Sequence, residues 1–114
     1  KYKDTSVIPK LIQVLERKEK NVMSAALLAL ESLTRQSWGL NAKKWYSWWE
    51  KNHQRTRTAW LVDALESKDK VVREKALKEL IRVSGDDFGY VATASRWGRG
   101  RSVTRWKAWL KQHT

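Results

Sequence analysis

The residues whose types could do chemistry together stand in one short segment, Arg96-Trp97-Gly98-Arg99-Gly100-Arg101. Guanidinium groups form forked hydrogen bonds with phosphate and carboxylate groups, and an indole can stack on a nucleic-acid base. The glycines between them predict a flexible loop that presents these groups together. The segment therefore indicates a binding site for an anionic partner, and a solvated, partly disordered loop is the plainer alternative.

Residues suited to catalysis or metal binding are scarce in this chain. It contains no cysteine, which excludes disulfides, thiolate catalysis and cysteine-ligated zinc. The only histidines, His53 and His113, stand far apart in the sequence near expected helix C-termini, and no cluster of metal-ligating residues is indicated. The Gly98–Gly100 segment lacks the further glycine or the Lys-Ser/Thr pair of the known phosphate-binding loops. We therefore expect no enzyme activity, no metal and no cofactor.

An internal repeat indicates which elements position this segment. At an offset of 50, nine residues recur with the same type: Leu11, Leu15, Glu16, Lys18, Lys20, Val22, Ala26, Leu27 and Leu30 match Leu61, Leu65, Glu66, Lys68, Lys70, Val72, Ala76, Leu77 and Leu80. The match resumes at an offset of 61, where Trp45 meets Trp106 and Trp48 meets Trp109. The second copy therefore holds 11 extra residues, 91–101.

Each copy predicts three helices, because its apolar residues recur at helical spacing and no stretch alternates as a strand does. The third helix is expected over 42–52 in the first copy and over 102–112 in the second. The residues expected to cap helix starts are Ser6, Asn41, Thr56 and Ser102. Gly39 and Gly89 are expected at positive φ in tight turns. The fold class predicted is all-α.

The length of 114 residues suits a single domain. We expect one helical-repeat domain over 1–114, with repeat one at about 5–54 and repeat two at about 55–114, the latter carrying an inserted basic loop at 91–101. No apolar run is long enough to span a bilayer and no signal-peptide pattern opens the chain, so the expected location is cytoplasmic.

The second copy resembles the HEAT repeat in the run Asp69-Lys70-Val71-Val72-Arg73-Glu74-Lys75-Ala76-Leu77. The first copy has Glu19 and Met23 at the Asp and Arg positions. The tail of each copy resembles a bacterial variant with a Trp-x-x-Trp-Trp third helix, here Trp45, Trp48 and Trp49. This resemblance implies two HEAT-like units in a short right-handed α-α superhelix, a solenoid fragment. It also implies that Asp69 and Arg73 pair to brace the turn.

The tryptophans of the third helices admit more than one interpretation. Trp45, Trp48 and Trp49 share one helix face, and Trp106 and Trp109 repeat that spacing. Covering the repeat core is the first interpretation, and contact with a partner or a membrane surface are the alternatives. Trp97 differs, because it stands in the insertion and has no counterpart in the first copy.

The net charge of +12 is unevenly distributed. Residues 32–60 hold six basic residues and only Glu50 against them, and no acidic residue occurs from 88 to 114. The candidate partner-binding residues on this basic edge are Lys43, Lys44, Arg55, Arg57, Arg96, Trp97, Arg99, Arg101 and Arg105. We expect a non-enzymatic interaction or scaffold module that binds an acidic protein surface. The alternative is a nucleic-acid module that contacts the phosphate backbone and stacks Trp97 on a base.

Overall fold

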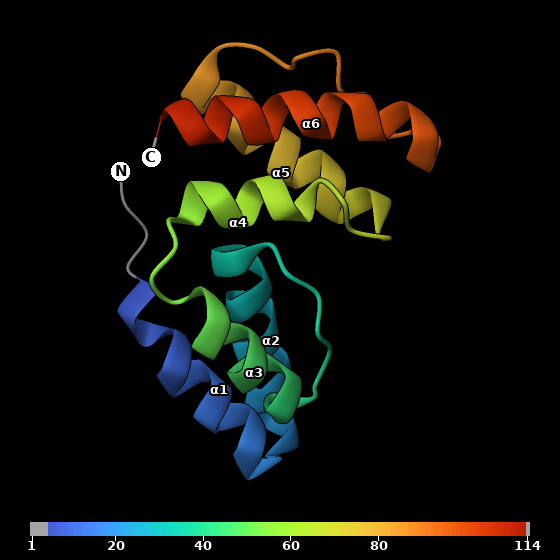
Figure 1. The fold of residues 1–114 in the computed structure, drawn as a ribbon. Helices are drawn as coiled ribbons and strands as arrows, with labels where there is room; N and C mark the ends of the chain where they lie inside the picture. Colours follow the sequence, from blue (N-terminus) through green and yellow to red (C-terminus); the bar gives the residue numbers. More distant parts are fainter. Residues whose placement is uncertain (1–4, 114) are drawn as a thin grey trace. The chain divides into compact units, whose positions relative to one another are not determined.

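The computed structural model describes residues 5–113, and all regular structure within them is helical. A short 3-10 helix η1 (Thr5–Val7) precedes six α-helices. These are α1 (Ile8–Arg17), α2 (Lys20–Thr34), α3 (Ala42–Asn52), α4 (Arg57–Ala64), α5 (Lys70–Ser84) and α6 (Arg96–Gln112) (Figure 1). The predicted all-α class is confirmed. None of these helices is long and apolar enough to cross a membrane.

The chain divides into two compact units, residues 1–54 and 55–114. The division falls where the sequence predicts that repeat one ends and repeat two begins. Each unit holds three of the helices, and in each the first helix contacts both the second and the third. The two copies of the repeat therefore correspond to two structural units with the same order of elements.

In unit 1, α1 supplies the buried stripe against which α2 and α3 pack. Ile8, Ile12 and Leu15 are buried, and their helical spacing places them on one face. Pro9 lies in the first turn of α1, where a missing amide donor leaves no hydrogen bond unmade. Trp45 of α3 is fully buried, and its indole Nε1 donates a hydrogen bond to the Gly39 carbonyl oxygen over 2.8 Å.

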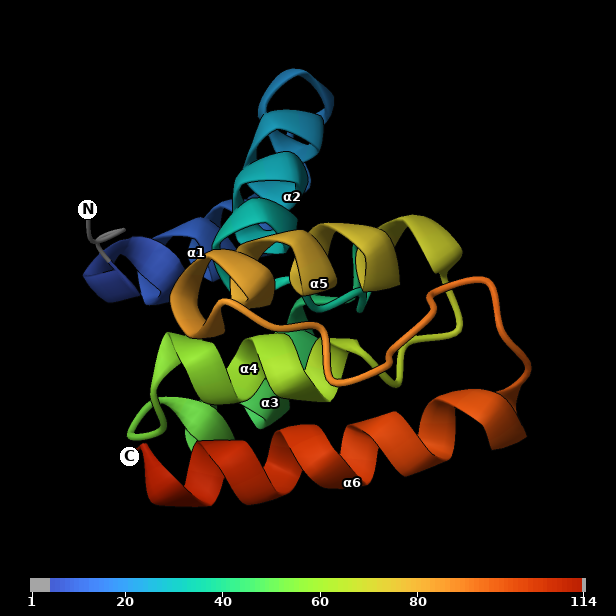
Figure 2. The ribbon, with the colours of Figure 1, turned by 90° about the horizontal axis from the view of Figure 1, so that it is seen from above.

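In unit 2, α4 lies between α5 and α6 and runs antiparallel to α6 (Figure 2). Leu61 of α4 and Leu65 directly after it pack in one buried cluster with Leu80 of α5 and Trp106 of α6. The segment before α6 joins this core through Tyr90, whose hydroxyl donates a hydrogen bond to the Leu65 carbonyl oxygen. The apolar stripe of α4 thus holds α6 in place.

Arg73 ties together the turn before α5 and the segment before α6. It is buried, and its guanidinium donates to the carbonyl oxygens of Ser67, Lys68 and Ala92 over 2.9 to 3.1 Å. The ion pair with Asp69 that the HEAT resemblance implied does not form. Asp69 is instead the N-cap of α5, and its carboxylate accepts the Val71 amide hydrogen there. An N-cap side chain reaches the first free amides of its own helix without any change in the fold.

Two of the four predicted helix caps are confirmed. Asn41 accepts the Lys44 amide hydrogen and Thr56 accepts the Ala59 amide hydrogen. The prediction for Ser6 is wrong, because a 3-10 turn precedes α1 and Val7 stands at its N-cap. Gly39 and Gly89 adopt φ of +63° and +76°, as the turn pattern predicted.

The third helix of unit 2 begins earlier than the sequence predicted. The expected loop 91–101 is helical from Arg96 onward, and Ser102, the expected cap, is buried inside α6. Ser95 caps the helix instead by accepting the Gly98 amide hydrogen, and the Arg99 guanidinium reaches back to the Ala94 carbonyl oxygen over 2.6 Å. These local hydrogen bonds compensate for two glycines that lower helix propensity.

Candidate anion-binding surface on α6

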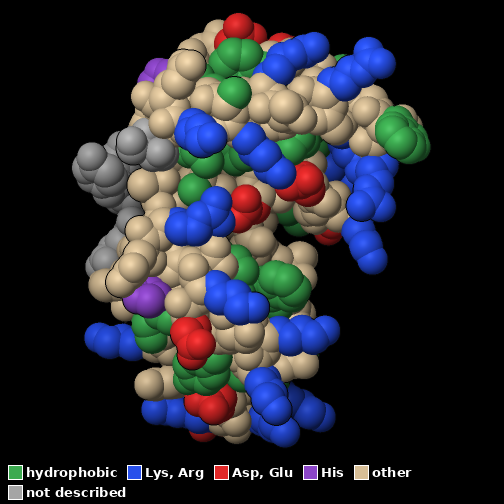
Figure 3. Space-filling view, in the orientation of Figure 1, with side chains coloured by type: hydrophobic (Ala, Val, Ile, Leu, Met, Phe, Trp, Pro, Cys, Tyr) green, Lys and Arg blue, Asp and Glu red, His purple; other side chains and the backbone are tan. Residues whose placement is uncertain are grey.

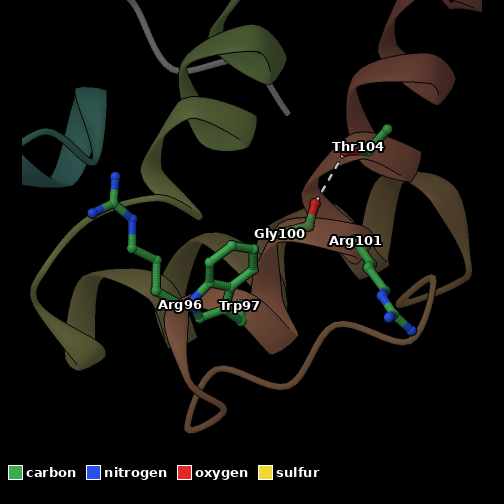
Figure 4. Close-up of a pocket in the computed structure, with 5 residues that line it drawn as sticks. All are labelled: Arg96, Trp97, Gly100, Arg101 and Thr104. Carbon is green, nitrogen blue, oxygen red and sulfur yellow. Dashed lines mark hydrogen bonds between the residues drawn. The ribbon is translucent and has the colours of Figure 1, made fainter.

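Trp97 is the most exposed large apolar side chain among the described residues, at 91%. It lies in the first turn of α6, and Arg101 and Thr104 follow four and seven residues later, so the three share one side of the helix. Figure 4 shows the side chains of Arg96 and Arg101 extending in opposite directions on the two sides of the Trp97 indole. The structure therefore presents an indole between two cations.

The guanidiniums of Arg96 and Arg101 have no ion-pair or hydrogen-bond partner among residues 5–113. Arg99 and Arg105 differ, since each donates to a main-chain carbonyl oxygen, that of Ala94 and of Phe88 respectively. Lys and Arg side chains gather at the end of unit 2 where α6 begins (Figure 3). Arg96 and Arg101 therefore keep all their donors for an external anion.

Two hollows meet at the beginning of α6. The larger, of about 650 Å³, is lined by Arg96, Trp97, Gly100, Arg101 and Thr104. The smaller, of about 260 Å³, lies between α6 and the end of α4 and is lined by Leu65, Glu66, Lys68, Arg96, Arg99, Gly100 and Val103. Arg96 and Gly100 line both. We call the residues around the two hollows the α6 surface.

The smaller hollow is cationic. Lys68, Arg96 and Arg99 line it, and its one carboxylate, Glu66, already has a cationic partner in Lys107, with 3.3 Å between Nζ and Oε2. Sequence reasoning missed Lys68, because its place in a charged turn, matched by Lys18 in the first copy, gives no sign of a site. Only the packing of α4 against α6 brings it to Arg96 and Arg99.

Tyr90 lies near this hollow in the core of unit 2. Burial raises the pKa of its hydroxyl, and the nearby positive charges of Arg99 and Arg73 partly offset the rise. The hydroxyl therefore stays protonated at neutral pH and serves as a donor to the Leu65 carbonyl oxygen. Through this bond Tyr90 fixes the segment that leads into α6.

The remaining predicted site residues do not join the α6 surface. Arg55 pairs with Asp63 over 2.6 Å and Arg57 with Glu79 over 2.7 Å, so both neutralise acids of their own unit. Arg57 begins α4 and Arg55 stands two residues before it. Because α4 runs antiparallel to α6, both lie at the opposite end of unit 2 from Arg96. Lys43 and Lys44 are exposed in the first turn of α3 in unit 1.

The other third-helix tryptophans belong to the core, except that Trp49 is only half-buried and lies against Trp48 and His53. Trp45, Trp48 and Trp106 are buried, and Trp109 packs against the core cluster of unit 2, which confirms the core interpretation for them. The matched pair differ in one respect. Trp45 has a hydrogen-bond partner for its Nε1, whereas the buried Nε1 of Trp106 has none among the described residues.

No three His, Cys, Asp and Glu side chains within residues 5–113 come together in an arrangement that could hold a metal ion. The α6 surface offers cations and one exposed aromatic ring, which can bind and orient an anion. Comparison of the chain with protein-family models, with curated proteins and with solved structures gave no match.

Proposed function

We propose that this chain is a non-enzymatic helical interaction module that binds a nucleic acid through the α6 surface. One observation carries the proposal: Trp97, 91% exposed, stands between Arg96 and Arg101, which have no partner among the described residues. A nucleic acid supplies both of the complementary groups, phosphates for the guanidiniums and base faces for the indole. The absence of acidic residues throughout α6 favours such a polyanion further.

The architecture proposed for this module is a HEAT-like one. Three observations support it: a duplicated sequence, three helices in each unit, and a first helix that contacts the other two in both units. Repeats of this kind stack into a right-handed α-α superhelix and leave extended surfaces for partners. In this proposal the core tryptophans cover the repeat, and the α6 surface is the part that a partner contacts.

An acidic protein surface is the second candidate partner. Tryptophan and arginine are the residues that most often dominate the binding energy of protein interfaces, so Trp97 with its two arginines would also suit such a partner. The two candidates differ in what the indole meets. A nucleic acid offers a flat base at every position, whereas an acidic peptide offers carboxylates without regular aromatic partners.

The test is binding of a fluorescein-labelled oligonucleotide, followed by fluorescence anisotropy at about 50 and 200 mM salt, where electrostatic binding is strong and then weak. The variant is Arg96→Glu with Arg101→Glu. Each arginine that contacts a phosphate contributes about 0.7 to the slope of log K against log salt on a single strand and about 0.9 on a duplex. We therefore expect the magnitude of the slope to fall by about 1.4 to 1.8 in this variant.

The matched control is Lys43→Glu with Lys44→Glu, which makes the same change in net charge on exposed residues of unit 1. Each double reversal lowers the net charge from +12 to +8, because each substitution removes one positive charge and adds one negative charge. Equal weakening in both variants would show that overall charge, and not the α6 surface, drives binding. If no oligonucleotide binds at low salt but poly-L-glutamate does, the partner is an acidic protein and the proposal of a nucleic acid is wrong.

A further inference from the structure

We infer that the α6 surface holds one nucleotide of a single-stranded nucleic acid, with the base on Trp97 in the larger hollow and its phosphate in the smaller one. The inference rests on the proposed function and adds to it the strandedness of the partner and a two-part site. Its basis is that the two hollows share Arg96 and Gly100 but differ in chemistry. One contains the only indole of the surface, and the other contains Lys68 and Arg99 beside Arg96.

The larger hollow suits a base. Its five lining residues all lie on α6, so it is an open surface hollow in which a base can lie flat on the Trp97 indole. A base can reach the face of Trp97 only when it is unstacked from its neighbours, as in a single strand, because the bases of a duplex are stacked on one another. The flanking Arg96 and Arg101 can then bind phosphates on either side of that base.

The smaller hollow suits a phosphate group. At about 260 Å³ it is too small for a drug-sized ligand, and three cationic side chains line it. They come from two segments, Lys68 from the turn after α4 and Arg96 and Arg99 from α6. The single carboxylate in its wall, that of Glu66, is paired with Lys107. The hollow therefore carries an excess of positive charge that a phosphate can neutralise.

Gly100 separates the two hollows, and the fold gives no reason for a glycine there. Its φ is not in the left-handed region, and a Cβ built on it would meet nothing within 4 Å. Glycine is also among the poorest helix formers, so an alanine at this position would favour α6. Because Gly100 lines both hollows, a bulky side chain at position 100 would narrow each of them. The glycine therefore leaves room for a base on one side and a phosphate on the other.

Three probes test the inference on the full chain: a 15-residue oligothymidylate, an abasic oligomer of the same length, and a 15-base-pair duplex. Stacking of one base on an aromatic side chain corresponds to about a 5- to 150-fold change in affinity. We expect the oligothymidylate to bind tighter than the abasic strand by a factor in this range, and the duplex to gain nothing from Trp97. Trp97→Leu should lower oligothymidylate binding to the abasic level and leave abasic binding unchanged.

Two further variants examine the hollows. Gly100→Leu should weaken oligothymidylate binding at least fivefold while circular dichroism shows unchanged helix content, and Ala108→Leu, exposed further along α6, is the matched control that should bind normally. Lys68→Gln should lower the salt slope by about 0.7, whereas Lys70→Gln, which lines neither hollow, should not.

The outcomes separate this inference from the proposed function. If no oligonucleotide binds at about 50 mM salt, the proposed function fails and the nucleotide site fails with it. If oligothymidylate, abasic strand and duplex bind equally, and Trp97→Leu and Gly100→Leu bind as the unaltered chain does, nucleic-acid binding stands and the nucleotide site is overturned. If poly-L-glutamate alone binds, the acidic protein is the partner and both are overturned.

Discussion

The matched tryptophans Trp45 and Trp106 should respond differently to loss of the indole N–H. Both are fully buried, and both pack edge-to-face on an aromatic neighbour, Trp48 at 6.2 Å and Phe88 at 4.7 Å between ring centroids. The Nε1 of Trp45 donates to the Gly39 carbonyl oxygen, whereas that of Trp106 has no partner among the described residues. Replacement by phenylalanine removes a similar apolar volume at the two sites. The loss of packing energy is therefore similar in both variants and largely cancels when their free energies of unfolding are compared.

The remaining difference follows from the hydrogen bonds. At Trp45 the substitution removes a bond that contributes about 0.5 to 1.5 kcal/mol to the free energy of unfolding. At Trp106 it removes a buried donor whose desolvation without a partner destabilises the unit by about 1 to 3 kcal/mol. Trp45→Phe should therefore lower the free energy of unfolding of its unit by about 1.5 to 4.5 kcal/mol more than Trp106→Phe lowers that of unit 2.

Native-state hydrogen exchange measures this difference unit by unit, because the slowest amides in each unit report its complete opening. The amides of Leu30 and Leu80, both fully buried in matched helices, are suitable reporters. Replacement of each tryptophan by 3-benzothienylalanine, which keeps the shape and lacks the N–H, controls for volume. An equal or larger loss at Trp106 in both series would refute the reasoning.

Gly89→Ala and Gly39→Ala should each lower the free energy of unfolding by about 1 to 2 kcal/mol in urea titrations, because both glycines adopt positive φ, and an unchanged stability in either variant would contradict this. At Gly89 a Cβ would also approach the Arg105 Nη1 to 2.9 Å, but this atom ends a flexible, exposed side chain that can move aside, so the two losses should be similar. Because the pKa of Tyr90 is raised in the folded state, its contribution to stability is complete below the unfolded value of about 10 and is lost as the pH rises towards the folded value. Tyr90→Phe should make the free energy of unfolding fall less steeply as the pH rises above about 10, and profiles for the two proteins that stay parallel through the alkaline range would argue against it. Thr56→Ala should lower the free energy of unfolding by about 1 kcal/mol through loss of the cap on α4, whereas Thr58→Ala, which caps no helix, should have little effect on the same urea titration.

The sequence predicted those features that depend on local chemistry. The third helix of unit 1 has the predicted bounds, because Asn41 is a strong N-cap and the tryptophans that follow recur at helical spacing. The same approach failed for α6, since glycines at 98 and 100 indicated a loop while the cap at Ser95 went unrecognised. The composition of residues 96–101 correctly indicated a basic segment with an aromatic residue, but it predicted a loop where the structure has a helix.

The candidate site was predictable only in part, for reasons of packing. Arg96 and Trp97 are exposed on α6, as their place in an unmatched insertion suggested. The excess of basic residues over 32–60 also predicted Arg55 and Arg57 as site residues. A count of charges along the sequence does not show ion pairs, and Asp63 and Glu79 come near these arginines only in the folded chain. Lys68 joins the site for the same reason, through contacts that no local pattern contains.

The α6 surface lies where the two copies of the repeat differ. α3 and α6 match from Trp45 and Trp106 onward, and residues 96–101 extend α6 beyond that match. A helix is hard to nucleate but easy to extend, so the part of α6 held by Trp106 supports turns that would not form alone. This explains how a segment with two glycines is helical without a buried stripe of its own. It also explains how an aromatic ring and unpaired cations could be added to unit 2 without disturbing its own core, whose pattern repeats that of unit 1.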